Sequence, residues 1–210
     1  MRRALRNPFV WFFLAGALSL PLMRPLLRRD PPPPPVVGQL PSFTLTGADG
    51  LPFGSEELAG RVWVADFIFT RCGSICPVLS RSMASLQERY RDWNVDGVHL
   101  VSITVDPDYD TPERLREYGV TYGLDPERWT MLTGSPDDVR NLVAGGFRLA
   151  MGSPEGAGAD IIDVAHSGRL VLVDGEGGIR GYYDSNAEGL DEVFHRSIHV
   201  LREAESRADE

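Results

Sequence analysis

Cysteine is scarce in this chain, since only Cys72 and Cys76 occur among its 210 residues. A disulfide between them would close a loop of three intervening residues, and so short a loop adds little to the free energy of folding. The sequence thus excludes a fold that depends on disulfides for its stability. The pair lies in FIFTRCGSICP, residues 67–77, where an apolar strand is expected to run into a helix. Backbone N–H groups at a helix N-terminus favour the thiolate, so we interpret the pair as a site that attacks disulfides or holds a soft metal ion.

Basic residues are also few, because lysine is absent and the formal net charge is −9. Six of the arginines fall within residues 1–29, which contain no acid, so the rest of the chain is more acidic than the whole. An acidic body without a basic stripe is repelled by phosphate groups. This charge distribution excludes DNA and RNA as main ligands.

A run without charges, residues 9–23, predicts a membrane signal near the N-terminus. As a helix it would reach only about 22 Å, short of the roughly 30 Å hydrocarbon core, unless the span continues past Arg24 to Leu27. The small-residue triplet at 15–17 comes too early for an ordinary cleavage site. We therefore expect residues 1–29 to form an uncleaved anchor, with a cleaved signal as the alternative, and the rest of the chain to be exported.

Proline is concentrated directly after this segment, with five in succession at residues 31–35. Such a run favours an extended polyproline conformation. We predict a Pro-rich linker at 30–40 and one folded domain at 41–210.

Strand and helix patterns alternate within the predicted domain. A hairpin is predicted at 42–53, with turn residues 47–50 between two short strands. Further strands are predicted at 62–69, 98–105, 129–133, 169–173 and 179–183. Helices are predicted after Pro77, after the N-caps Thr111 and Ser135, and at about 190–205. This order predicts an α/β fold with helices on both faces of a central sheet.

A soft metal ion held by two thiolates needs a third ligand from elsewhere in the chain. Met83 shares its helical spacing with apolar neighbours and is interpreted as a core residue. His99 lies in a predicted buried strand, and His195 and His199 lie on one face of the last helix, so we interpret all three as packed or solvated. His166 precedes the strand at 169–173, and its spacing leaves a ligand and a loop-capping role equally open.

Three segments in order, residues 67–77, 101–112 and 166–174, make the chain similar to the Sco/SenC family of copper-handling proteins. The resemblance spans essentially the whole domain. It implies a thioredoxin-like fold, with a central mixed sheet flanked by helices and an N-terminal β-hairpin. It also implies a copper ion held by Cys72, Cys76 and His166, with the two cysteines as the redox pair. Asp106 and Asp110 match the acidic loop segment of the family.

The family helps to assemble the binuclear copper centre of cytochrome c oxidase. The resemblance therefore implies a metallochaperone that delivers copper to that centre or reduces the cysteines there. Implied partners are the copper-site subunit of the oxidase, copper donors and thioredoxin-like reductants. The implied location is the bacterial inner membrane, with the domain facing the periplasm. Gly73 and Ser74 stand where the family commonly has proline and an acid, so we expect the thiolates to form more readily here.

Two other functions fit parts of the sequence. A membrane-anchored thiol–disulfide oxidoreductase without obligatory metal would use the same cysteines, and reductase activity is the only enzymatic activity that we expect. Thioredoxin-like reductases usually carry a cis-proline before the strand that faces the active site, whereas the last proline here is Pro154. A binding module without chemistry is disfavoured, because all three candidate ligands are present.

Overall fold

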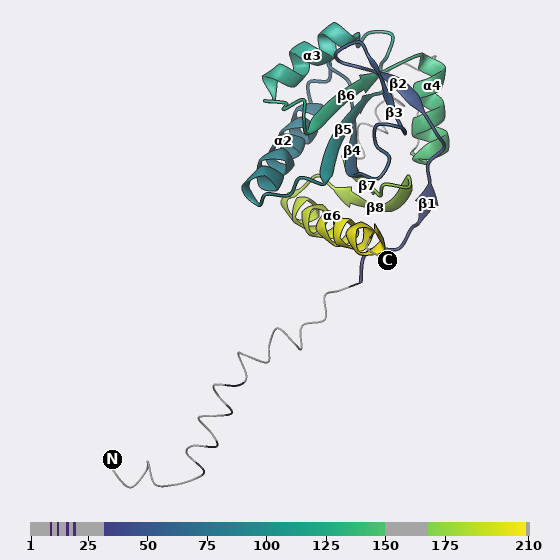
Figure 1. The fold of residues 1–210 in the computed structure, drawn as a ribbon. Coiled ribbons are helices and arrows are strands. Elements are labelled where there is room, and N and C mark those ends of the chain that lie inside the picture. The colour runs from purple at the N-terminus through teal and green to yellow at the C-terminus, as the bar shows by residue number, and fades with distance from the viewer. Residues whose placement is uncertain are drawn as a thin grey trace. The chain divides into compact units, whose positions relative to one another are not determined.

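Figure 1 shows the computed structural model of the chain, which describes residues 32–149 and 168–208 together with a few isolated residues nearer the N-terminus. The chain divides into two compact units, Met1–Pro32 and Pro33–Glu210. In the first unit, the isolated described residues that are helical are Phe9, Phe12, Gly16 and Ser19. Within the described residues, no helix has the length and apolar character needed to cross a bilayer. Most of the predicted anchor, residues 1–29, lies outside the described residues and stays a prediction.

The second unit is built on one mixed sheet of eight strands in the order β1-β8-β7-β4-β5-β6-β2-β3. The strands are β1 (Gly38–Gln39), β2 (Thr44–Gly47), β3 (Pro52–Gly54), β4 (Val62–Ile68), β5 (Val98–Thr104), β6 (Trp129–Thr133), β7 (Arg169–Val173) and β8 (Gly178–Asp184). The three central strands β4, β5 and β6 are parallel, and β7 runs antiparallel to β4. The predicted hairpin is the antiparallel pair β2 and β3, which joins the sheet through β6.

Helices flank the sheet as the sequence pattern predicts. They are α2 (Cys76–Asp92), α3 (Pro112–Thr121), α4 (Pro136–Arg140), the π-helical turn η2 (Asn141–Gly146) and α6 (Ala187–Ala208). The predicted N-caps are confirmed, because Thr111 and Ser135 accept hydrogen bonds from backbone N–H groups of the first turns of α3 and α4. These caps and the proline that follows each one determine where α3 and α4 begin.

The apolar core lies on both faces of the sheet, and alternate residues of β4 supply both sides. Val64 and Ile68 belong to the cluster that also contains residues of α2, α3 and α6. Trp63 and Phe67 belong to the opposite cluster, with residues of α4 and η2. All seven residues of β4 and all seven of β5 are buried, as expected for central parallel strands covered on both faces. Met83 is fully buried in the first cluster, which confirms its prediction as a core residue.

The short strand β1 is an element that the sequence pattern did not predict, and it lies within the segment predicted as a linker, 30–40. It pairs with β8, and the adjoining Val37 N–H donates to the Ile179 carbonyl at 2.8 Å. A two-residue strand offers too few side chains to show a period of two, which explains why the pattern did not reveal it.

Candidate metal centre

Both cysteines lie at the end of β4, where the chain turns into α2. Cys76 is the first residue of α2, and Cys72 lies in the loop that connects it to the strand. The two thiols are free, and they are buried, with 9% of Cys72 and none of Cys76 exposed. The strand-to-helix junction predicted from the sequence is therefore confirmed as the position of the pair.

Cys72 is the cysteine whose environment favours the thiolate. Burial acts to raise its pKa, but backbone N–H groups of Cys76 and Ser74, together with the side chains of these two residues, outweigh burial and lower the pKa to about 7. The Ser74 hydroxyl lies 3.6 Å from the Cys72 sulfur. The N-cap position, Ile75, makes no side-chain hydrogen bond to the described helix start, and the first amide of α2, that of Cys76, faces the Cys72 sulfur.

Cys76 has the opposite character. Burial raises its pKa well above that of a free thiol, and its side-chain hydrogen bond to Cys72 and the charges of Cys72 and Asp66 raise it further. A thiol that donates to a neighbouring thiolate stabilises that thiolate while keeping its own proton. Near neutral pH a large fraction of Cys72 is therefore thiolate while Cys76 keeps its proton, which suits stepwise attack on a disulfide or stepwise capture of a soft ion.

The histidines that the structure describes do not join this pair. His99 lies opposite Trp63 at the start of β5, whereas the cysteines follow the far end of β4. It is buried, stacks on Phe53 and shares a hydrogen bond of 2.9 Å with Thr130. Burial, assisted by the charge of Arg61, lowers the pKa of His99 to about 4. These contacts confirm a packed strand residue.

The pair on the last helix is also apart from the thiols. His195 is half exposed and lies 3.7 Å from a carboxylate oxygen of Asp191 on the same helix. Within the described part of the chain, no group of three or more His, Cys, Asp or Glu side chains could hold a metal ion. The predicted third ligand, His166, lies outside the described residues, so its role stays a prediction.

The sequence over residues 35–201 matches the family model SCO1/SenC. The chain belongs to the SCO1/SenC family. A SCO1 protein homolog of Bacillus subtilis is 33% identical over 151 residues, which cover 71% of this chain and 76% of that protein. The resemblance seen in the sequence is thereby confirmed.

Solved Sco structures share the fold. BsSco, described as a member of the Sco family of cytochrome c oxidase assembly proteins with a disulfide switch, superposes with a TM-score of 0.69 at 29% identity, covering 83% of this chain and 98% of that one. Yeast Sco1 with copper bound superposes with a TM-score of 0.57 at 26% identity, covering 77% and 92%. The predicted thioredoxin-like class of the mixed sheet is thus confirmed.

In this SCO1/SenC chain, Gly168 is the described residue nearest in sequence to His166. It directly precedes β7, and its carbonyl accepts a hydrogen bond of 3.0 Å from the Ser185 N–H. A Cβ placed on Gly168 would lie 3.8 Å from the Cδ1 atom of Ile75. Ile75 is the residue before Cys76, so the described chain end that leads to His166 lies beside the cysteine loop.

The acidic loop of this Sco protein contacts the residues that precede Cys72. Asp106 forms an ion pair of 2.6 Å with Arg71, and the Arg71 guanidinium lies 4.9 Å from the centre of the Tyr109 ring. Asp110 is fully buried and binds Thr70. The sequence could match this loop to the family but could not show these contacts, because they join residues some 35 to 40 positions apart.

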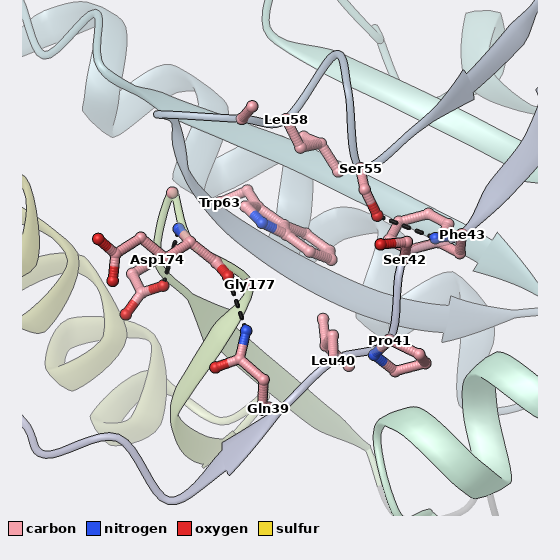
Figure 2. Close-up of a pocket in the computed structure, with 13 residues that line it drawn as sticks. Gln39, Leu40, Pro41, Ser42, Phe43, Ser55, Leu58, Trp63, Asp174 and Gly177 are labelled. Atoms are coloured by element: carbon pink, nitrogen blue, oxygen red, sulfur yellow. Dashed lines mark hydrogen bonds between the residues drawn. The ribbon is translucent and has the colours of Figure 1, made fainter.

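A separate pocket of about 270 Å³ lies at the other end of the sheet (Figure 2). Trp63, near the start of β4, lines it together with Leu40 and Leu58, and the Gln39 side chain donates to the Glu176 carbonyl at 2.7 Å. Because the cysteines follow the opposite end of β4, this pocket is not part of the thiol site.

Proposed function

We propose that this protein binds copper through Cys72 and Cys76, with His166 as the third ligand, and serves the assembly of the copper centre of cytochrome c oxidase. The observation that carries the proposal is the pair of buried, free thiols at the strand-to-helix junction, with the pKa of Cys72 lowered to about 7. Thiolates are preferred ligands of soft ions such as Cu(I). Copper in yeast Sco1 and the description of BsSco as an oxidase assembly protein support the choice of metal and pathway.

The donor set fits copper once a third ligand is supplied. Two sulfurs leave a soft ion under-coordinated, and imidazole is a suitable partner for them. Two residues of extended chain span at most about 7 Å, and Gly168 lies against Ile75, so a ligand role for His166 is compatible with the described chain end. This constraint supports His166 over the other three histidines.

Copper is the cargo of this site, and the chain's own residues govern its capture and release. Cys72 engages the ion first because its pKa of about 7 lets it ionise near neutral pH, where Cys76 keeps its proton. Cys76 then loses its proton as its sulfur coordinates, so copper binding releases protons and strengthens as the pH rises, most steeply below about 7, where Cys72 must also lose its proton. Delivery proceeds by exchange of these sulfurs for the sulfurs of the copper-site subunit.

The unequal thiols also favour a second function, reduction of the cysteines of the target. In that reaction the Cys72 thiolate attacks a target disulfide, and one target sulfur leaves as a thiolate. Cys76 then gives up its proton and attacks the mixed disulfide, which releases the second target thiol and forms a Cys72–Cys76 disulfide. The low pKa of the attacking sulfur and the retained proton of the second are the observations that support this step.

Replacement of His166 separates the two functions. We expect His166→Ala to weaken Cu(I) binding by at least tenfold, because the ion loses one of three ligands, while thiol–disulfide exchange with a model disulfide is kept. Competition with a Cu(I) chelator under reducing conditions measures the affinity of the full chain. His195→Ala is the matched control, since His195 lies half exposed on α6 beside Asp191. Equal affinity in His166→Ala and the parent would contradict the ligand assignment.

A further inference from the structure

We propose that Asp110 is a positioning residue that holds Cys72 in place for the proposed copper and thiol chemistry, on which this inference rests. Asp110 lies in the loop between β5 and α3, and its side chain is fully buried. One carboxylate oxygen accepts from the Thr70 N–H at 3.0 Å and from the Thr104 hydroxyl at 2.5 Å. The other accepts from the Thr70 hydroxyl at 2.5 Å.

These three hydrogen bonds define what Asp110 does. Two of them go to Thr70, which lies two residues before Cys72, and the third goes to Thr104, the last residue of β5. The Thr104 hydroxyl is fixed in turn, because it accepts from the Asp106 N–H at 3.0 Å. A buried carboxylate that accepts several hydrogen bonds ties its donors together strongly. Asp110 therefore joins the start of the cysteine loop to the central sheet.

The two sulfurs have different anchors. Cys76 is fixed by α2, where the Leu79 N–H already bonds to the Ile75 carbonyl in the first turn. Cys72 has no such helix, and its own N–H bonds only to the local carbonyl of Phe69. Between them Gly73 is exposed, and a Cβ there would meet no described atom within 4 Å. The Cys72 sulfur contacts Ser74 and Cys76, but the backbone that leads to Cys72 is held to the sheet by the anchor at Thr70.

A second tether, the ion pair of Arg71 and Asp106, is weaker. The Arg71 side chain is 57% exposed, and exposed ion pairs contribute little because solvent screens them. The hydrogen bonds of Asp110 are shielded from water, and so their loss is not replaced by solvent. Among the described contacts to residues 70 and 71, those of Asp110 are the ones that determine the loop conformation.

The test measures two properties of the full chain, Cu(I) affinity and the equilibrium of the Cys72–Cys76 disulfide with glutathione. We expect Asp110→Asn to weaken Cu(I) binding at least tenfold, because the two sulfurs are no longer held in positions from which both can coordinate the same ion. We expect it also to disfavour the disulfide by about tenfold, which is about 30 mV for a two-electron couple, because the same loss of positioning lowers the effective concentration of one sulfur at the other.

Matched variants separate positioning from stability. Asp174→Asn is the control, because Asp174 is a buried carboxylate that accepts from the Gly178 N–H and from Arg180 at the opposite end of the sheet. It should lower stability without changing either property. Thr70→Ser keeps the hydroxyl donor and should behave like the parent, whereas Thr70→Val removes one hydrogen bond and should give a partial loss. If Asp110→Asn does not fold, the same two measurements on Thr70→Val provide the test.

The possible results distinguish failure of the positioning role from failure of the proposed function. A folded Asp110→Asn with unchanged copper affinity and unchanged disulfide equilibrium overturns the positioning role, as does an equal effect of Asp174→Asn. If the parent binds no copper, the proposed function fails, while the disulfide equilibrium still decides the role of Asp110.

Discussion

The side chain of Asp66 is fully buried, but only one of its two carboxyl oxygens has a described hydrogen-bond partner. It lies in β4, where its Oδ1 accepts from the Ser102 hydroxyl at 2.5 Å and its Oδ2 has no hydrogen-bond partner among the described residues. The Trp129 ring N–H also donates to the Ser102 hydroxyl. Burial raises the pKa of Asp66 to about 7, although the hydrogen bond from Ser102 favours the charged form. Asp66 is therefore a carboxyl group that folding keeps protonated well above its ordinary range.

This raised pKa makes stability depend on pH. The folded protein holds a proton on Asp66 that the unfolded chain loses above pH 3.8, so this contribution is fully present below that pH and is lost as the pH rises through about 7. Between pH 5 and pH 8 we expect the parent to lose about 2–3 kcal/mol of unfolding free energy that Asp66→Asn does not lose. Urea unfolding at both pH values measures the difference, and identical pH slopes in the two proteins would refute it.

At the scale of single elements, α2 serves both the core and the thiol site. Its first residue is Cys76, Pro77 follows at a position that needs no N–H partner, and one face carries the apolar stripe predicted from the sequence. Leu79, Met83 and Leu86 are all buried against the sheet. The same packing that stabilises the helix therefore holds Cys76 and its backbone N–H, which faces the Cys72 sulfur.

Substitution of Met83 tests whether this α2 residue belongs to the core or binds copper. Met83→Ala should lower the free energy of unfolding by about 2–5 kcal/mol, because it leaves a cavity in a fully packed cluster. Met83→Leu, which nearly conserves volume, should cost less than about 1.5 kcal/mol. Chemical denaturation measures both. Cu(I) affinity should stay unchanged in each variant at temperatures where it is folded, and a tenfold loss in Met83→Leu would instead indicate a ligand.

Sequence patterns predicted the elements in which apolar residues recur over several turns of a helix or along a strand. The central strands and the caps at Thr111 and Ser135 follow from apolar runs and local chemistry, and the structure confirms them. The start of α6 at Ala187, three residues before the predicted one, follows a cap that the apolar pattern did not reveal, because the Asn186 side chain accepts a hydrogen bond of 2.8 Å from the Gly189 N–H. The cysteine pair was evident from its spacing. The contact of Asp110 with Thr70 was not, because it depends on how β4 and β5 are paired.

For the whole molecule, the junction between linker and domain lies far from the thiols. Arg180 on β8 donates to the Pro34 carbonyl at 2.8 Å, to Asp174 at 2.6 Å and to Glu203 at 2.8 Å. The residue beside it, Ile179, pairs with Val173, which lies opposite Trp63 at the start of β4. The cysteines follow the other end of that seven-residue strand, which is about 20 Å long.

Arg180 is expected to stabilise the contact between the end of the polyproline segment and the domain. Arg180→Gln should lower the free energy of unfolding by about 3–5 kcal/mol, because the Arg180 side chain is only 5% exposed and its removal leaves Asp174 buried without its charged partner. It should also increase amide hydrogen exchange in residues 36–40. Unfolding curves and exchange mass spectrometry check the two effects. Arg196→Gln, which breaks an exposed pair with Glu192, should change stability by less than about 0.5 kcal/mol.

The separation of linker and thiols bears on which surfaces the protein can serve. The chain that leads to the N-terminus enters the domain beside Arg180, whereas Cys72 and Cys76 follow the far end of β4. A partner that docks over the two sulfurs can therefore do so without displacing the entering chain.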